Sequence, residues 1–424
     1  MDALSLESEV KIYCRNVPSV FVRAKNAVLY DEEGQAHIDL LSACGALNYG
    51  HNHPKLIDSL LQYIAGGGVS AAMDLNTTVK RDFLCELEQT ILQPRGLAYK
   101  VQFTGPTGTN AVEAALKLAR KVTHRQNVVA FSNAFHGMTL GALSVTGNAL
   151  ARKGAGLPLG GVVRLPFDDH TTVSLSALET YARMVESASG GLEAPAAFVL
   201  EAVQGEGGLN VASPAWLEAV QATARRLGAL VILDDVQAGC GRTGTFFSFE
   251  GKPFDPDIVC LAKSIGGVGL PLALVLIKPR FDLWEPGEHT GTFRANGMAL
   301  AAATAALELW RDTTFVQAIA ERADLLTAWI TRICRSYPRI TRAKGIGLMQ
   351  GIEFASSMLA SAVVRNAVGR QLVLESCGPY DEVVKVMPPL TIEVDLLREA
   401  LDRLEDAIAQ AVDETCQQVR LAAE

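Results

Sequence analysis

Short apolar runs alternate with helical segments through the middle of the chain, and this alternation constrains the fold more than any other feature. Helical periodicity occupies 110–122 and 215–228, and the second segment has Ser213 and Pro214 as start signals and Gly228 as a stop. Strands and helices in alternation predict a parallel or mixed sheet covered by helices on both faces. The apolar runs are 128–131 (VVAF), 198–203 (FVLEAV), 230–235 (LVILDD), 257–262 (DIVCLA) and 272–277 (LALVLI).

The pattern changes after about residue 300. Long helical patterns are followed by short strands and a last amphipathic helix, which predicts a smaller α+β domain at the C-terminal end. We expect residues 1–60 to join that small domain, 61–300 to form the large domain and 301–424 to form the small one. The helical patterns are 297–310, 315–337 and 395–420, and the strands lie within 347–354 and 383–392.

Composition excludes several classes of protein. With 49% hydrophobic and 20% charged residues in 424, the chain is globular, and a net charge of −8 argues against nucleic acid as the main partner. No apolar run of about 18 residues predicts a membrane span, and the N-terminus lacks the regions of a signal peptide. The eight cysteines are scattered without a C-x-x-C pair, which is typical of the reducing cytoplasm and predicts neither a disulfide nor a metal site.

Polar residues of chemical interest lie just beyond predicted strands, where ligands bind in open α/β sheets. The stretch FTGPTGTNAVEAALK (103–117) is a glycine-rich turn that enters a helix at about Asn110, and its backbone N–H groups suit a phosphate. It is neither a P-loop nor a dinucleotide fingerprint, and a plain helix start is the alternative. Phe135 and His136 precede a glycine and offer a stacking face to a planar ligand, although an aromatic loop residue often belongs to the core.

Acidic residues and one lysine complete the set. Glu201 lies inside an apolar run, whereas Glu206 is interpreted as a solvated turn residue. Asp234 and Asp235 end the run 231–233, where an unpaired charge is costly, so at least one of them needs a cation. Lys263 follows another apolar strand; burial there lowers the pKa of an amine and makes it a nucleophile, unless the side chain reaches solvent.

A phosphate cradle, a stacking aromatic, a buried carboxylate and a nucleophilic lysine together describe what pyridoxal 5′-phosphate (PLP) requires. Its aldehyde forms a Schiff base with a lysine, and its ring nitrogen needs an anionic partner. Intact Lys263 and Asp234 disfavour a non-catalytic scaffold, and the missing fingerprint disfavours a nicotinamide dehydrogenase.

These residues resemble the class III (ω-amino acid) PLP-dependent aminotransferases of fold type I over nearly the whole chain. The motifs are NYGHNHPKL, GTNAVEAALKLAR, FHG, EAVQGEGG, DDVQAGCGRTG with Lys263 downstream, GTF, GIGLMQGIEF and MPPLTI. The resemblance implies an α/β fold, with a mainly parallel seven-stranded sheet in the large domain and a smaller α+β domain. It also implies a homodimer.

The resemblance assigns roles residue by residue. Lys263 would carry the cofactor and shuttle the proton, and Asp234 would pair with the ring nitrogen. Glu201 resembles a gating carboxylate that meets an arginine in some members, and Asp235 is expected to meet backbone donors or a structural cation. Gln237 would lie near the phenolic oxygen, and Val236 and Phe135 would enclose the ring. Gly108 and Thr109 would hold the phosphate, His136 would contact the cofactor, and Thr292 would complete the neighbouring subunit's site.

Within the class, LNYGHNHPKL, GPTGTNAVEAA and DDVQAGCGRTGTFFSFE are similar to the group that acts on diaminobutyrate and 2-oxoglutarate. Asn110 and Asp235 stand where many members have Glu. Lys385 lies where several ω-transaminases have a carboxylate-binding arginine, and Arg242 has no assigned role. The alternatives are ornithine, acetylornithine, 4-aminobutyrate or a secondary-metabolite amine as substrate, or a PLP aminomutase or decarboxylase.

Overall fold

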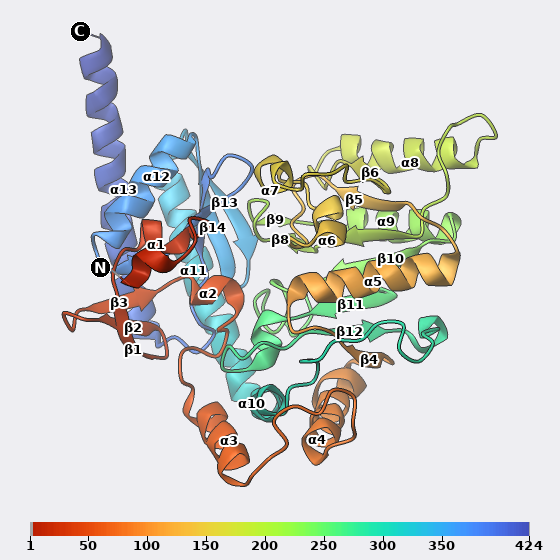
Figure 1. Ribbon diagram of the computed structural model, residues 1–424. Coiled ribbons are helices and arrows are strands. Elements are labelled where there is room, and N and C mark those ends of the chain that lie inside the picture. The colour runs from red at the N-terminus through yellow and green to blue at the C-terminus, as the bar shows by residue number, and fades with distance from the viewer. Residues whose placement is uncertain (1–2, 424) are drawn as a thin grey trace.

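A seven-stranded sheet forms the centre of the computed structural model, which describes residues 3–423 (Figure 1). β12 is antiparallel to both of its neighbours, and all other neighbouring pairs are parallel, which confirms the mainly parallel sheet predicted from the sequence. In spatial order the strands are β4 (Lys100–Phe103), β12 (Leu274–Ile277), β11 (Ile258–Leu261), β10 (Leu230–Asp234), β7 (Ala197–Leu200), β5 (Val128–Phe131) and β6 (Val162–Leu165).

Both faces of this sheet are covered, because successive side chains of a strand point to opposite faces. Val231 and Leu233 of β10 belong to the apolar core that includes α8 (Thr172–Glu186) and α9 (Pro214–Arg226). Ile232 belongs to the other core, with α5 (Gly108–Thr123). Figure 1 shows α5 on one side of the sheet and α8 and α9 on the other.

The helix termini follow the predicted signals. α5 begins at Gly108, slightly before the expected Asn110, because the Thr107 hydroxyl accepts the N–H of Asn110 and caps the first turn. The Ser213 hydroxyl likewise accepts the N–H of Trp216 and starts α9. Gly228 follows α9 with a φ of +63°, a conformation that glycine adopts without strain.

The C-terminal quarter forms a second, smaller unit in which three helices lie beside a four-stranded antiparallel sheet (Figure 1). This confirms the long helices predicted at 315–337 and 395–420 and the short strands, whereas the helix over 357–368 was not predicted. The helices are α11 (Thr313–Ser336), α12 (Ser357–Val368) and α13 (Val394–Ala423), and the strands are β13 (Thr341–Ile346), β14 (Met349–Phe354), β17 (Val383–Val386) and β16 (Ser376–Cys377).

N-terminal strands join this smaller unit. β15 (Leu372–Val373) pairs in parallel with β3 (Ala36–Asp39), although more than 300 residues separate them. The remaining elements of this region are β1 (Phe21–Lys25), β2 (Val28–Asp31), α1 (Tyr13–Asn16) and α2 (Ser42–Gly45). The exact division of the chain at residues 60 and 300 stays a prediction.

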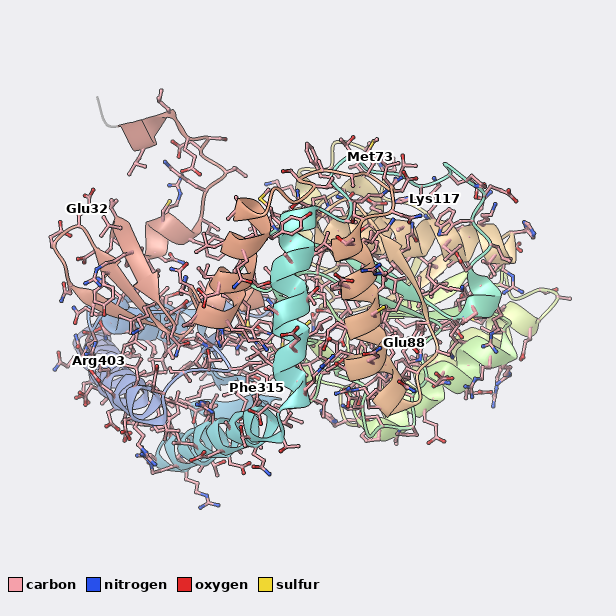
Figure 2. The ribbon with its side chains drawn as sticks, turned by 90° about the horizontal axis from the view of Figure 1, so that it is seen from below. Glu32, Met73, Glu88, Lys117, Phe315 and Arg403 are labelled. Carbon is pink, nitrogen blue, oxygen red and sulfur yellow. The ribbon has the colours of Figure 1, made fainter. Side chains whose placement is uncertain are left out.

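The helix α10 (Gly297–Leu307) connects the two units and is apolar on all sides, as expected for a buried helix. It lies between α3 (Pro54–Ala65) and α4 (Thr78–Glu86), as Figure 2 shows. Within residues 3–423, no helix combines the length and the apolar character needed to span a membrane. The short elements near the sheet edge are α6 (Leu140–Val145), α7 (Ala149–Lys153), β8 (Val203–Gln204) and β9 (Asn210–Val211).

Candidate active site

A cavity of about 170 Å³ lies at the carboxyl ends of the parallel strands, where the sequence predicts the site. It gathers all the predicted site residues except Thr292, and it adds Gly137 and Glu206. These residues come from five separate segments between positions 108 and 263. The lining residues are Gly108, Thr109, Phe135, His136, Gly137, Glu201, Glu206, Asp234, Val236, Gln237 and Lys263.

Asp234 ends β10 and is only 5% exposed. Its Oδ2 lies 2.7 Å from His136 Nδ1, and its Oδ1 accepts the backbone N–H of Val236 at 3.1 Å. Burial opposes protonation of His136, but the hydrogen bond to Asp234 and its charge outweigh burial and raise the pKa of the imidazole. His136 therefore compensates the negative charge of the carboxylate on one side, and the other side of the carboxylate still lines the cavity.

Glu201 is held by the backbone and not by a cation. Its carboxylate accepts the N–H groups of Phe135 at 3.1 Å and of Gly205 at 3.3 Å. Burial and the nearby Asp234 raise its pKa to about 7. Among the described residues no arginine forms an ion pair with Glu201, and its gating role stays a prediction.

Lys263 lies two residues after the end of β11 and opens a single 3₁₀ turn that ends at Gly266. Its φ is +53°, a left-handed conformation that is uncommon and costly outside glycine and is often found at functional sites. Burial lowers the pKa of its ammonium group. The side chain lines the cavity, so Lys263 presents an amine with nucleophilic character there.

The N-terminus of α5 supplies an anion-binding surface. A Cβ on Gly108 would lie 2.8 Å from Val236 Cγ1, and one on Gly137 would lie 2.4 Å from Thr109 Oγ1. Only glycine therefore fits at either position, and the backbone approaches the cavity closely. The N–H groups of the first helical turn have no partner within the helix, and together with the helix dipole they favour a phosphate.

Glu206 is an ion-paired residue at the wall of the cavity, and its interpretation as a solvated turn residue is wrong. Its Oε1 accepts hydrogen bonds from Lys385 Nζ at 2.9 Å and from Gln237 Nε2 at 3.2 Å. Burial of Glu206 opposes ionisation, but Lys385 and then Lys263 outweigh it and lower its pKa to about 2. The lysine comes from β17 in the other unit, 179 residues away, so local sequence carries no signal of the contact.

Asp235 turns away from the cavity. It is 1% exposed, and its Oδ2 accepts the N–H of Ser248 at 3.1 Å, which confirms the expected backbone donor. Burial raises its pKa to about 7. Among the described residues, Oδ1 has no hydrogen-bond partner.

Arg242, which has no role assigned from the sequence, is completely buried and joins the two units. Its guanidinium donates to Asn48 Oδ1 at 2.7 Å and to the carbonyl oxygens of Leu348 and Pro388. This contact fixes the smaller unit against the loop that follows Asp235, so we infer a structural role.

Thr292 is exposed and does not line the cavity of its own chain. The segment around it lies against residues 70–74: Arg294 forms an ion pair with Asp74 at 2.8 Å, and the N–H of Gly297 donates to the Ser70 carbonyl. The predicted contact of Thr292 with a neighbouring site concerns a second subunit.

The residues present fit PLP. The cavity combines glycine backbone at a helix N-terminus for a phosphate, Phe135 and Val236 as apolar walls, the Asp234 carboxylate and the Lys263 amine. His136 Nε2 is buried without a hydrogen-bond partner among residues 3–423, which shows that the imidazole is held by Asp234 alone. No group of at least three His, Cys, Asp or Glu side chains arranged for a metal occurs in the described part of the chain.

Comparison with known proteins agrees with this chemistry. The family model "Aminotransferase class-III" matches residues 12–408. A diaminobutyrate–2-oxoglutarate transaminase of Halalkalibacterium halodurans is 50% identical over 409 residues, which cover 96% of each chain. One of Vibrio cholerae is 51% identical over 393 residues, covering 92% of this chain and 95% of that protein.

Solved structures share the fold. The ornithine aminotransferase of Toxoplasma gondii, at 24% identity, superposes with a TM-score of 0.83 over 97% of this chain and 94% of that chain. A second structure of that enzyme, with partial occupancy of PLP at the active site, gives the same TM-score and coverage at 25% identity. An aminotransferase of Bacillus anthracis has a TM-score of 0.84 at 22% identity, covering 96% of each chain.

Proposed function

The chain belongs to the class III aminotransferase family, and from this premise we propose that it transfers the 4-amino group of L-2,4-diaminobutyrate to 2-oxoglutarate. The products are aspartate 4-semialdehyde and glutamate, formed in two half-reactions of a ping-pong cycle. The expected fold type I and PLP dependence are those of the family and of its solved structures. Relatives of about 50% identity that carry this activity in their names support the choice of substrate.

The observation that carries the proposal is the meeting of Lys263 and Asp234 in one cavity beside the N-terminus of α5. When bound, PLP supplies an electron sink that makes the hydrogen on the amine-bearing carbon acidic. The lowered pKa of Lys263 favours a neutral Nζ, which can accept that proton and return it. Asp234, fixed by His136 and the Val236 N–H, would keep its negative charge against the ring nitrogen.

The other lining residues position the reactants. We assign Gly108 and Thr109 to the phosphate, Phe135 and Val236 to the two faces of the ring, and Gln237 to its phenolic side. The hydroxyl of Thr109 lies 2.6 Å from that of Thr139, which fixes its rotamer. Gln237 Nε2 also donates to the Cys44 carbonyl at 3.0 Å, so its amide is held from two sides.

A homodimer would complete the site through Thr292. The exposed segment that carries it adjoins large exposed apolar side chains, including Met73 at 51% and Phe293 at 65% (Figure 2 labels Met73). Large exposed apolar side chains near this segment support an interaction surface. Leu61, Ile64, Val69 and Leu75 are also exposed.

Mixed dimers test the shared site. Lys263→Ala and Thr292→Ala subunits are combined. If Thr292 serves the partner's site, a mixed dimer has one site with both defects and one site with neither, so activity returns. Unchanged cofactor affinity in the Thr292→Ala homodimer would contradict the assignment.

The substrate is tested by measuring half-reaction rates with L-2,4-diaminobutyrate, ornithine, acetylornithine and 4-aminobutyrate on the purified enzyme. We expect diaminobutyrate to give the largest kcat/KM and to require 2-oxoglutarate for turnover. Inactivity with diaminobutyrate would refute the substrate, and turnover without a 2-oxo acid would indicate an aminomutase or decarboxylase.

We also place the enzyme in a reducing compartment, the cytoplasm. The seven cysteines whose side chains are described are all free, and the three buried ones, Cys240, Cys260 and Cys377, have raised pKa values because they are buried. Such thiols remain protonated and unreactive at neutral pH. Localisation of a tagged chain in its cell of origin tests the proposal.

A further inference from the structure

Lys385 is shared by two carboxylates and is completely buried. Its Nζ lies 2.9 Å from Glu206 Oε1 and 2.5 Å from Glu375 Oε1. Glu206 belongs to the turn after β8 in the larger unit and lines the cavity, whereas Glu375 lies between β15 and β16 in the smaller unit. A single buried ammonium group therefore joins a carboxylate of the cavity wall to a carboxylate behind it.

The smaller unit holds Lys385 and Glu375 together independently of Glu206. The backbone N–H of Lys385 donates to the Glu375 carbonyl at 3.0 Å, and Lys385 also pairs with β14 through Gly351. The side chain of Glu375 is 10% exposed, against 33% for Glu206. Glu375 is thus the fixed partner of the lysine, and Glu206 is the more accessible one.

The cluster carries one negative charge in excess, because two carboxylates share one ammonium. Its other polar neighbours are neutral: Gln237 Nε2 donates to Glu206, and Cys44 Sγ lies 3.5 Å from Glu375 Oε1. Lys263 lies near Glu206 but is the amine that reacts, and burial lowers its pKa, so it is not a permanent counter-ion. A carboxylate in excess within a partly desolvated site favours a cationic ligand.

The two carboxylate oxygens of Glu206 differ in the number of hydrogen bonds that they accept. Both hydrogen bonds reach Oε1, and in the described part of the chain Oε2 has no hydrogen-bond partner. An ionised carboxylate offers acceptor sites on both oxygens. Oε2 is therefore available to a donor in the cavity that Glu206 lines.

We propose that Glu206 binds the α-ammonium group of the diamino acid, and that Glu375 makes this possible by neutralising Lys385 from behind. This subsite rests on the proposed function and specifies how the substrate is recognised. The two amino groups of diaminobutyrate lie roughly 5 Å apart in an extended chain by standard bond lengths. One reacts at the Lys263 end of the cavity while the other meets Glu206. Glu375 is a positioning residue, since it acts through Lys385.

The test compares L-2,4-diaminobutyrate with 4-aminobutyrate, which has the same reacting amine and carboxylate but lacks the α-ammonium group. The ratio of their kcat/KM values is measured in Glu206→Gln and Glu375→Gln, with Glu382→Gln as the control. The Glu382 carboxylate accepts the N–H of Tyr380, so its variant makes an equal change in charge outside the cluster. We expect the ratio to fall at least tenfold in Glu206→Gln, about threefold or more in Glu375→Gln, and to stay unchanged in the control.

Calorimetric Kd values of the two ligands on Lys263→Ala provide a second readout that does not depend on turnover. Adding Glu206→Gln to this variant should weaken the binding of diaminobutyrate at least tenfold and leave the binding of 4-aminobutyrate unweakened. Glu375→Asp retains the negative charge and should keep the ratio of the two kcat/KM values within about twofold of wild type. This variant therefore distinguishes a role of the charge from a purely structural role of the side chain. If Glu375→Gln does not fold, the Glu206→Gln result decides.

An unchanged ratio in Glu206→Gln, or equal losses with both substrates, would overturn the proposal. That result is separate from failure of the proposed function, which would appear as wild-type enzyme without activity on diaminobutyrate.

Discussion

Replacing Asp235 by asparagine should stabilise the protein in a pH-dependent manner. The carboxyl group is 1% exposed, its Oδ2 accepts only the Ser248 N–H, and Oδ1 lacks a partner among the described residues. Burial raises its pKa to about 7, well above the ordinary value of an aspartate. The asparagine side chain would keep an acceptor for the Ser248 N–H and carry no charge, so the substitution removes the titration with little change in shape.

Folding stability is linked to the protonation of Asp235. Because its pKa is higher in the folded state, the folded protein binds more protons, and its stability falls as the pH rises from about 4 to about 7. At about 1.4 kcal/mol per pKa unit, the raised pKa of Asp235 costs on the order of 2 kcal/mol at pH 5, where the folded protein must keep the group protonated, and roughly 4 kcal/mol at pH 8. The stability advantage of Asp235→Asn over wild type should therefore grow by roughly 2–3 kcal/mol between these two pH values.

Urea unfolding of both proteins at pH 5 and pH 8 measures this difference, provided that the slopes of the transitions agree. Asp324→Asn on α11 is the matched control, because Asp324 is exposed and the same substitution there removes no buried carboxyl group. A stability difference for Asp235→Asn that is the same at both pH values would refute the reasoning. It would mean that the negative charge of Asp235 is compensated by a partner in the folded enzyme.

Three further substitutions test the site and its support. Lys263→Ala should abolish transamination and the visible absorbance of bound cofactor, and persistence of both would exclude Lys263 as the attachment point. His136→Ala removes the donor to Asp234 Oδ2 and should weaken cofactor binding about tenfold or more in a titration of the cofactor-free enzyme; binding as in wild type would contradict the positioning role. Arg242→Met leaves buried acceptors such as Asn48 Oδ1 unpaired and should lower the free energy of unfolding by about 3 kcal/mol; denaturation midpoints within error of wild type would show that the contact is dispensable.

Local sequence determined five of the seven sheet strands, all except β4 and β6 at the two edges, and much of the site. The fully apolar runs at 128–131 and 230–233 predict buried strands, since only strands covered on both faces are apolar at every position. The carboxyl ends of neighbouring parallel strands meet at one edge of the sheet, so residues that follow them, such as Asp234 and Lys263, converge. The family resemblance then supplied roles for residues whose local pattern was ambiguous, including Phe135 and Glu201.

Only the tertiary structure decided which charges meet. Glu206 has the local sequence of an ordinary turn residue, and its ion pair depends on Lys385, which lies on a strand 179 residues later in the chain. Glu375 belongs to the cluster because the fold of the smaller unit places it beside Lys385. The same holds for Asp235, whose direction depends on Ser248 and on the packing around it. Sequence periodicity indicates which face of an element is buried. The partner of a buried charge depends instead on how elements far apart in the sequence pack together, and a local sequence pattern does not contain the distances between them.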